Sequence, residues 1–190
     1  MTKKNFFIVS VLFVLFQWGL CAQEEHSVQV HDMKGAHRLS IGLGHAHVTE
    51  GTIEEETGWL AAPSWALDYD YWISNKWAIG LHNEILIESF AIEGKEEEEV
   101  IERKYPVAII PVGIWKPWKG LSLLAGVGVE LAEGHNFTVV RLGVEYGFHL
   151  PRNFEIGAAL IRDDKLDFYN TWVFGITISK IFPKKHHLED

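Results

Sequence analysis

Residues 171–182, with the sequence TWVFGITISKIF, alternate bulky apolar side chains with small or polar ones. One face carries Trp172, Phe174, Ile176 and Ile178, and the other carries Thr171, Gly175, Thr177 and Ser179. A period of two residues is the period of a β-strand, whose side chains point alternately to its two faces. The segment therefore predicts a strand with one apolar face, and it ends on the aromatic residue Phe182.

Seven further stretches upstream show the same alternation. The eight predicted strands span residues 37–49, 60–74, 77–92, 104–117, 121–133, 136–150, 153–163 and 168–182. Short turns at 74–76, 117–120 and 151–153 alternate with longer or charged connections at 50–58, 93–103, 133–135 and 163–167. An even number of strands, with short turns at one end and longer loops at the other, is typical of bacterial outer-membrane barrels. This pattern predicts that both ends of the barrel segment face the periplasm.

The first 22 residues have the pattern of a secretory signal peptide. Lys3 and Lys4 precede an apolar run from Phe6 to Phe16, and Leu20-Cys21-Ala22 supplies a cleavage site. Cleavage there would remove Cys21, the single cysteine of the chain, and thereby exclude disulfides and thiol chemistry in the mature protein. We expect residues 23–36 to form a short periplasmic segment before the barrel.

Charge and hydropathy restrict the class of protein further. The chain carries a net charge of −9, which argues against nucleic-acid binding through a basic surface. Although 47% of its residues are hydrophobic, no run after residue 22 approaches the roughly 20 apolar residues of a membrane helix. If the mature chain crosses a membrane, it must do so with strands.

Strand alternation alone leaves open which face of the barrel points inward. A soluble, secreted lipocalin-like barrel with an apolar lumen would show the same period. Abundant glycine on the polar faces and the scarcity of lysine at strand centres favour lipid outside instead. Aromatic residues also gather in two belts, as at membrane interfaces. The predicted belts are Trp72, Trp77, Trp115, Trp118, Phe148, Phe154 and Phe182 on the turn side, and Trp59, Trp65, Phe90, Tyr105, Phe137, Tyr169 and Trp172 on the loop side.

In strand number, loop asymmetry and the terminal Thr-Ile-Ser-Lys-Ile-Phe, residues 37–182 resemble the OmpA/OmpX-type family of small outer-membrane barrels. The resemblance implies an all-β, eight-stranded antiparallel up-and-down transmembrane β-barrel, monomeric, in the cell outer membrane. It also implies contact with outer-membrane lipids and lipopolysaccharide, and reading of Phe182 by the barrel-assembly machinery. A charged C-terminal tail, residues 183–190, follows that signal. The family includes structural anchors, adhesion and host-interaction proteins and a few lipid-modifying enzymes, so the resemblance does not indicate which of these functions the protein has.

With the apolar faces outward, many ionisable residues point into the lumen. The predicted lumen network contains Arg38, Asp68, Asp70, His82, Glu84, Glu88, Glu130, Arg141, Glu145, His149 and Glu155. Eight-stranded barrels have interiors just wide enough to fill with side chains, so we interpret this set as a polar plug. An acid/base or proton-conducting site around His82 or His149 is the alternative.

Two acidic runs fall in the predicted loops. They are Glu54, Glu55 and Glu56, and Glu96, Glu97, Glu98 and Glu99. Like charges favour a solvated loop, and their carboxylates would attract cations or a basic surface partner. His45, His47 and His135 lie near the same rim, but nothing completes a metal site, and we predict none.

No catalytic pattern stands out. The chain lacks a Gly-x-Ser-x-Gly elbow, a His-Glu-x-x-His zinc motif and a phosphate-binding glycine loop. The sequence thus predicts a non-enzymatic barrel without cofactors, acting as a structural or surface-interaction protein through its acidic loops. A narrow channel or a lipid-modifying outer-membrane enzyme remains the alternative.

Overall fold

The computed structural model describes residues 32–53, 56–93, 100–166 and 168–184, with only the backbone at 50–53, 56–59, 93 and 100. The predicted signal peptide and most of the C-terminal tail lie outside these ranges. Within the described residues, no helix is both long enough and apolar enough to cross a membrane.

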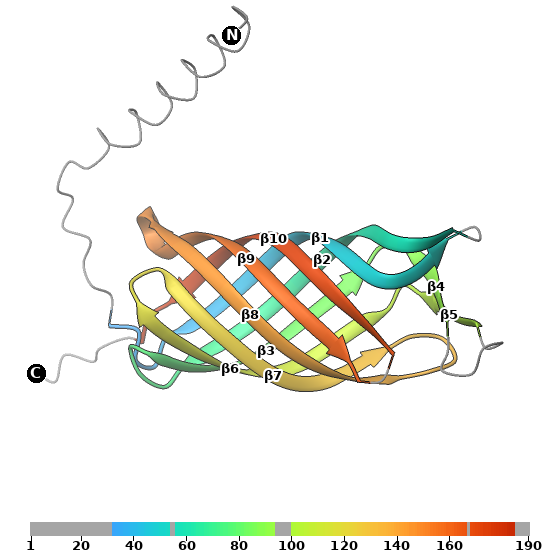
Figure 1. The fold of residues 1–190 in the computed structure, drawn as a ribbon. Coiled ribbons are helices and arrows are strands. Elements are labelled where there is room, and N and C mark those ends of the chain that lie inside the picture. Colours follow the sequence, from blue (N-terminus) through green and yellow to red (C-terminus); the bar gives the residue numbers. More distant parts are fainter. Residues whose placement is uncertain (1–31, 54–55, 94–99, 167, 185–190) are drawn as a thin grey trace, which may run out of the picture. The chain divides into compact units, whose positions relative to one another are not determined.

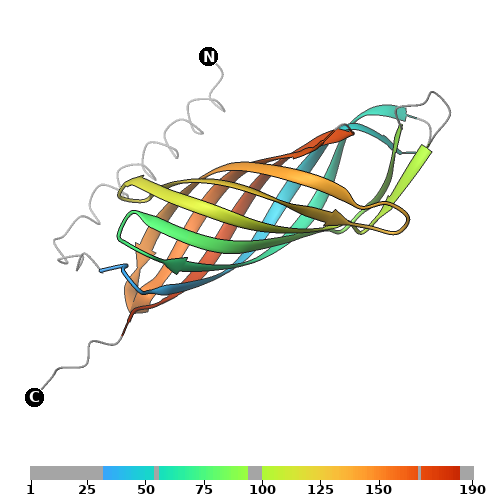
Figure 2. The ribbon, with the colours of Figure 1, turned by 90° about the horizontal axis from the view of Figure 1, so that it is seen from below.

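Eight strands form one antiparallel barrel wall. They are β1 (His37–Ile53), β2 (Glu56–Trp72), β3 (Trp77–Leu86), β6 (Val107–Trp118), β7 (Leu121–Leu131), β8 (Phe137–Leu150), β9 (Phe154–Lys165) and β10 (Tyr169–Phe182). Each strand pairs with the next in this order. The wall closes because β10 also pairs with β1, from His37 opposite Phe182 to Val48 opposite Thr171. Figures 1 and 2 show the red last strand beside the blue first strand.

The predicted fold class, a closed eight-stranded antiparallel barrel, is confirmed. Most predicted strand ends agree with the structure within three residues, with larger differences at the loop end of the wall. There, β3 stops at Leu86 rather than at residue 92, and β1 and β2 each extend about four residues further than predicted.

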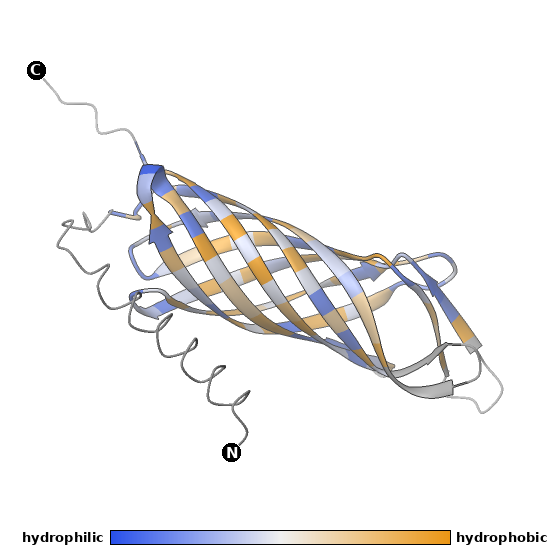
Figure 3. Cartoon of the chain, turned by 90° about the horizontal axis from the view of Figure 1, so that it is seen from above, coloured by the Kyte–Doolittle hydropathy of each residue, from blue (hydrophilic) through white to orange (hydrophobic). Residues whose placement is uncertain are grey.

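The apolar face of each strand points outward. Side chains such as Ile41, Leu67, Ile79, Ile176 and Ile178 are more than half exposed, and Ile176 reaches 61%. Figure 3 shows the resulting alternation of hydrophobic and hydrophilic residues along the strands. The lipocalin-like alternative is wrong, because the wall presents its apolar side chains outward while charged ones lie buried inside.

Tight turns join the strands at one end of the barrel, which we call the turn end. Between β6 and β7, Gly120 adopts φ +85°, and a Cβ there would lie 3.0 Å from the carbonyl oxygen of Gly147. This position therefore requires glycine. Met33, just before β1, is buried at this end, and its N–H donates to the Asn75 side chain over 2.8 Å.

The opposite end, which we call the loop end, carries an additional hairpin. It consists of β4 (Ser89–Glu93) and β5 (Val100–Lys104), and β4 also pairs with the extension of β1 at Gly51 and Thr52. One face of the hairpin, with Phe90, Ile92, Ile101 and Arg103, is buried. The prediction of a plain loop over residues 93–103 is therefore wrong at its C-terminal part, where β5 lies.

The predicted aromatic belts are partly corrected. Trp77, Trp115, Trp118, Phe148, Phe154 and Phe182 on the turn side are exposed on the outer wall, as are Trp65 and Tyr105 on the loop side. In contrast, Trp72, Phe90, Phe137 and Tyr169 are buried. At the loop end, Tyr169 packs edge to face against Phe90 of the hairpin and against Phe137 of β8. Their proximity to strand ends was therefore no guide to the face they occupy.

Candidate functional site

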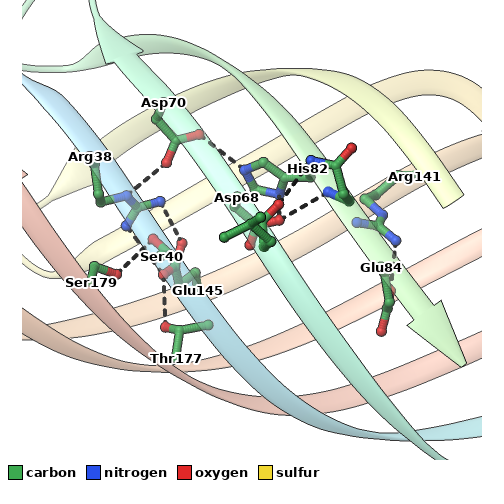
Figure 4. A network of polar contacts seen from close by, with 12 residues as sticks. Arg38, Ser40, Asp68, Asp70, His82, Glu84, Arg141, Glu145, Thr177 and Ser179 are labelled. Atoms are coloured by element: carbon green, nitrogen blue, oxygen red, sulfur yellow. Dashed lines mark hydrogen bonds and ion pairs between the residues drawn. The ribbon is translucent and has the colours of Figure 1, made fainter. Parts of the chain in front are cut away.

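The lumen is crossed at the turn end by ion pairs centred on Arg38 of β1. Its Nε donates to Asp70 over 2.7 Å, Nη1 to Glu155 over 3.0 Å and Nη2 to Glu145 over 3.0 Å. His82 Nε2 lies 3.0 Å from the other oxygen of Asp70. We call these five residues the Arg38 cluster; much of it is drawn in Figure 4. Because Arg38 is only 3% exposed, its charge depends on these carboxylates for compensation.

Strand register and glycine positions explain how the cluster fits inside a narrow barrel. Arg38 is directly opposite Asp70 in the β1–β2 ladder. A Cβ at Gly80 would lie 2.1 Å from Oδ1 of Asp70, and one at Gly147 would lie 2.6 Å from Cδ of Glu155. These two glycines therefore leave the space that the carboxylates occupy, as expected in a crowded lumen.

A second group of charges lies nearer the loop end and is centred on Arg141 of β8. Arg141 holds Asp163 with two hydrogen bonds of 2.7 Å, and its Nη2 also reaches Glu84 at 2.7 Å. All three side chains are buried. The paired hydrogen bonds match the planar guanidinium to the planar carboxylate, which is the strongest arrangement for such a pair. We call these residues the Arg141 cluster.

A third group, the Glu130 cluster, ties the hairpin to the wall. Glu130 of β7 accepts hydrogen bonds from Arg103 of β5 and from the Tyr169 hydroxyl of β10, both at 2.5 Å. Lys165 lies 3.5 Å from Glu130 and donates to Thr171. Arg103 also donates to the carbonyl of His135, and its guanidinium stacks on the ring of Phe137. The hairpin is thus held over the lumen by a fully buried cation.

The spaces left between these groups are small. One cavity of about 50 Å³ is bordered by Asp68, His82, Glu84, Arg141 and Glu145, and by small or apolar residues of β1, β2, β7, β9 and β10. Another of about 10 Å³ lies between Glu130, Asp163, Lys165 and Thr171. A water molecule needs roughly 10 to 15 Å³ of such volume and several polar partners, so the larger cavity has room for a few waters.

Nine of the eleven predicted lumen residues are buried inside the barrel, and His149 sits at its rim. Its Nδ1 lies 3.1 Å from Glu155, while 28% of its side chain is exposed. The placement of Glu88 on the third strand is wrong: Glu88 is half-buried in the bend between β3 and β4. Asp68 lines the larger cavity and accepts a hydrogen bond from the Asn83 N–H.

The structure adds lumen charges that we did not predict from the sequence. Asp163 and Lys165 were assigned to a loop, but β9 continues to Lys165 and turns both side chains inward. Continuing the period of two from Glu155 along β9 would have found them. Arg103 had no such signal, because its partner Glu130 is 27 residues away on another strand.

The histidine and acidic sets at the loop end are placed only in part. The rings of His45 and His47 stack 5.0 Å apart on the outward face of β1. Among the described residues no cluster of three metal-ligating side chains occurs. Glu54, Glu55 and Glu96 to Glu99 lie outside the described residues, and Glu56 is described by its backbone alone.

The closed wall, the outward apolar face and the charged lumen together define a small transmembrane β-barrel, and solved structures of outer-membrane barrels have the same fold. Ail, the attachment invasion locus protein of Yersinia pestis, solved in complex with the heparin analogue sucrose octasulfate, matches with a TM-score of 0.53 and 17% identity. The match covers 78% of this chain and 99% of Ail.

Two further solved structures have the same fold. Neisserial surface protein A matches with a TM-score of 0.53 and 10% identity, covering 78% of this chain and 100% of that one. The outer-membrane protein OprG from Pseudomonas aeruginosa matches with a TM-score of 0.50 and 11% identity, covering 81% and 98%. No protein-family model matches the sequence, and no curated protein matches it.

Proposed function

We propose that this protein is a non-conducting outer-membrane barrel that acts as a structural or surface-interaction protein through acidic segments at its loop end. The observation that carries the proposal is the filled lumen. Three clusters of buried ion pairs cross it, and the cavities between them measure about 50 and 10 Å³. A lumen of this kind leaves too little space for a solute or an acyl chain, so interactions fall to the loops.

The sign of the loop charges suggests the kind of partner. Glu54, Glu55 and Glu96 to Glu99 belong to connections between strands whose described ends lie at the loop end, and Glu56 is the first residue of β2. Sucrose octasulfate, the compound bound in the Ail structure, is a polyanion. Acidic segments would repel such a compound, so we propose that this chain engages divalent cations or a basic partner surface instead.

The test compares two variants with the parent in reconstituted vesicles. In the loop variant, Glu96 to Glu99 are replaced by Ser. In the lumen variant, Glu84→Gln, Arg141→Met and Glu145→Gln remove three lumen charges. We expect the parent and the lumen variant to bind polylysine and Ca²⁺, the loop variant to bind both more weakly, and all three to pass no solute.

A gel comparison of unheated and boiled samples verifies that each variant is a folded barrel before binding is measured. Solute flux in the parent that changes only in the lumen variant would overturn the proposal and make the protein a narrow channel. Equal polylysine and Ca²⁺ binding by the parent and the loop variant would remove the acidic segments from the function.

A further inference from the structure

The turn end of the barrel carries a ring of basic side chains. Six Lys or Arg residues with at least partly exposed side chains surround that end, and Asp32 is the one exposed acid among its described residues. We call these six the basic rim: Lys34, Lys76, Lys119, Arg152, Lys180 and Lys184. Lys116 is not counted, because its Nζ lies 5.3 Å from the ring centre of the buried Trp72, inside the barrel mouth. The chain as a whole has a net charge of −9, so the rim opposes the overall charge.

The basic rim is contributed by every turn of that end and by the segments flanking the barrel. The turns adjoin one another: the N–H of Lys116 donates to the carbonyl of Lys76 over 2.8 Å, and Lys180 Nζ donates to the carbonyl of Arg152 over 2.5 Å. Lys184 packs against Gly35, where a Cβ would meet its side chain at 3.0 Å. The charges therefore encircle the barrel end rather than form a patch on one side.

Aromatic side chains place the rim at the depth of lipid headgroups. Trp77 and Trp115 stack with their centroids 5.9 Å apart on the outer wall, and Trp118 is 71% exposed. Lys180 Nζ lies 4.2 Å from the ring centre of Phe154. Trp and exposed aromatic residues mark the membrane interface, and lysines extend along them to keep their charge in the headgroup region.

The exposed charged side chains described at the loop end are mostly acidic. Those that are at least partly exposed include the acids Glu88, Glu102, Glu133 and Asp164 and the bases Lys104 and Arg162. Both bases there already have acidic neighbours, since Lys104 lies 3.4 Å from Glu102 and Arg162 lies 3.6 Å from Asp164. Among the described side chains, only the turn end combines exposed aromatic residues with an unbalanced positive charge.

We propose that the basic rim binds anionic phospholipid headgroups in the leaflet that surrounds the turn end, and so enriches these lipids around the barrel. Phosphate groups complement the sign of the rim, and each Lys or Arg near an anionic membrane surface favours association by about fivefold. The basic rim forms a ring at the level of the exposed aromatic side chains. A ring of charge at this level fits lipids that surround the barrel. A cell-wall polymer would instead contact one exposed side.

The experiment measures which lipids contact the barrel. The protein is reconstituted in phosphatidylcholine vesicles that contain trace spin-labelled phosphatidylglycerol or phosphatidylcholine, and the motionally restricted fraction of each label gives their relative association constant. A rim variant carries Lys76→Gln, Lys119→Gln and Lys184→Gln. A matched control carries Lys104→Gln and Arg162→Gln at the loop end.

We expect the parent and the loop-end control to prefer phosphatidylglycerol by about fivefold or more at low salt, and the rim variant to prefer it by less than about twofold. Added salt should reduce the preference of the parent, because exposed charges are screened. A parent without preference, or equal losses in both variants, would overturn the proposal. Rim-dependent binding of soluble peptidoglycan fragments, without any lipid preference, would assign the rim to the cell wall instead.

Discussion

Arg38 shows what a single residue contributes to this barrel. Its guanidinium contacts Asp70, Glu145 and Glu155, and all four side chains are at most 7% exposed. Removing one partner of a buried ion pair leaves an uncompensated charge, which costs about 3 to 5 kcal/mol. We therefore expect Arg38→Met to lower the free energy of unfolding in urea, measured in lipid vesicles, by about that amount.

The matched control for Arg38 is Arg162→Met on the outer wall. Arg162 is 44% exposed and pairs loosely with Asp164, so its loss should change the unfolding free energy by less than about 1 kcal/mol. Similar losses for the two variants would contradict the assignment of Arg38 to a dry, paired cluster.

Two glycines give a second prediction at the residue scale. A Cβ at Gly128 would lie 2.2 Å from the carbonyl oxygen of Ile109, whereas at Gly113 the nearest atom is 3.9 Å away. Gly128→Ala should destabilise the barrel by about 1 to 3 kcal/mol through overpacking. Gly113→Ala should be neutral or stabilising by up to about 1 kcal/mol. Thermal unfolding of both variants, monitored by circular dichroism, checks the difference, and equal effects would refute it.

At the scale of an element, β10 tests which face meets lipid. Ile176 is 61% exposed near the middle of the strand, and Leu150 is exposed at the turn end of β8. Arg on a lipid-facing position costs about 2 to 4 kcal/mol at the bilayer midplane and about 0 to 1 near the interface. In equilibrium folding into vesicles, we therefore expect Ile176→Arg to lower the free energy of unfolding by the larger amount and Leu150→Arg to lower it by the smaller one. Indifference to both substitutions would indicate that water, not lipid, covers the wall.

The β4–β5 hairpin gives the second element-scale prediction. Arg103 is fully buried and links the hairpin to Glu130. Replacing Arg103 by Met breaks a buried ion pair, which should lower the stability of the hairpin against local opening by about 3 kcal/mol. A loss of that size makes the hairpin amides exchange faster by on the order of a hundredfold. Hydrogen exchange of Ile92 and Ile101 should therefore accelerate in Arg103→Met, while Val144 on β8 stays protected. Unchanged protection of the hairpin would show that its apolar face alone holds it.

The sequence predicted the eight strands of the wall better than it predicted the added β4–β5 hairpin. Period-two alternation located all eight wall strands, because one face of each meets lipid and the other meets a polar lumen. The hairpin was not predicted, since β4 and β5 are five residues each and flank the acidic run Glu96 to Glu99. Such a run usually indicates a solvated loop.

The lumen shows the same limit at the level of residues. Alternation put Arg38, Asp70 and Glu145 on the inward face, but it carries no information about which strands meet across the barrel. The pair of Arg38 with Glu145 joins residues 107 positions apart. Likewise, the sequence predicted Trp72 and Tyr169 in the aromatic belts at the membrane interfaces, but both side chains are buried. Whether these side chains are exposed depends on how the barrel closes and on which segments cover its two ends.

At the scale of the whole molecule, the barrel is covered at both ends and charged within. Met33 and Trp72 are buried at the turn end, and Phe90, Ile92 and Ile101 form the buried face of the hairpin at the loop end. The ion-pair clusters occupy the length between them. We therefore propose that interactions with other molecules fall to the basic rim and to the acidic segments that connect the strands of the loop end.

Conductance of single barrels in a planar lipid bilayer tests the central claim, that the lumen is closed, most directly. Purified protein, shown by its gel mobility to be folded, is inserted at high salt, and current is recorded at a series of voltages. We predict no discrete current steps, because ion pairs fill the lumen and its cavities hold at most a few waters. Reproducible steps of uniform size, altered by Glu84→Gln or Arg141→Met, would contradict it.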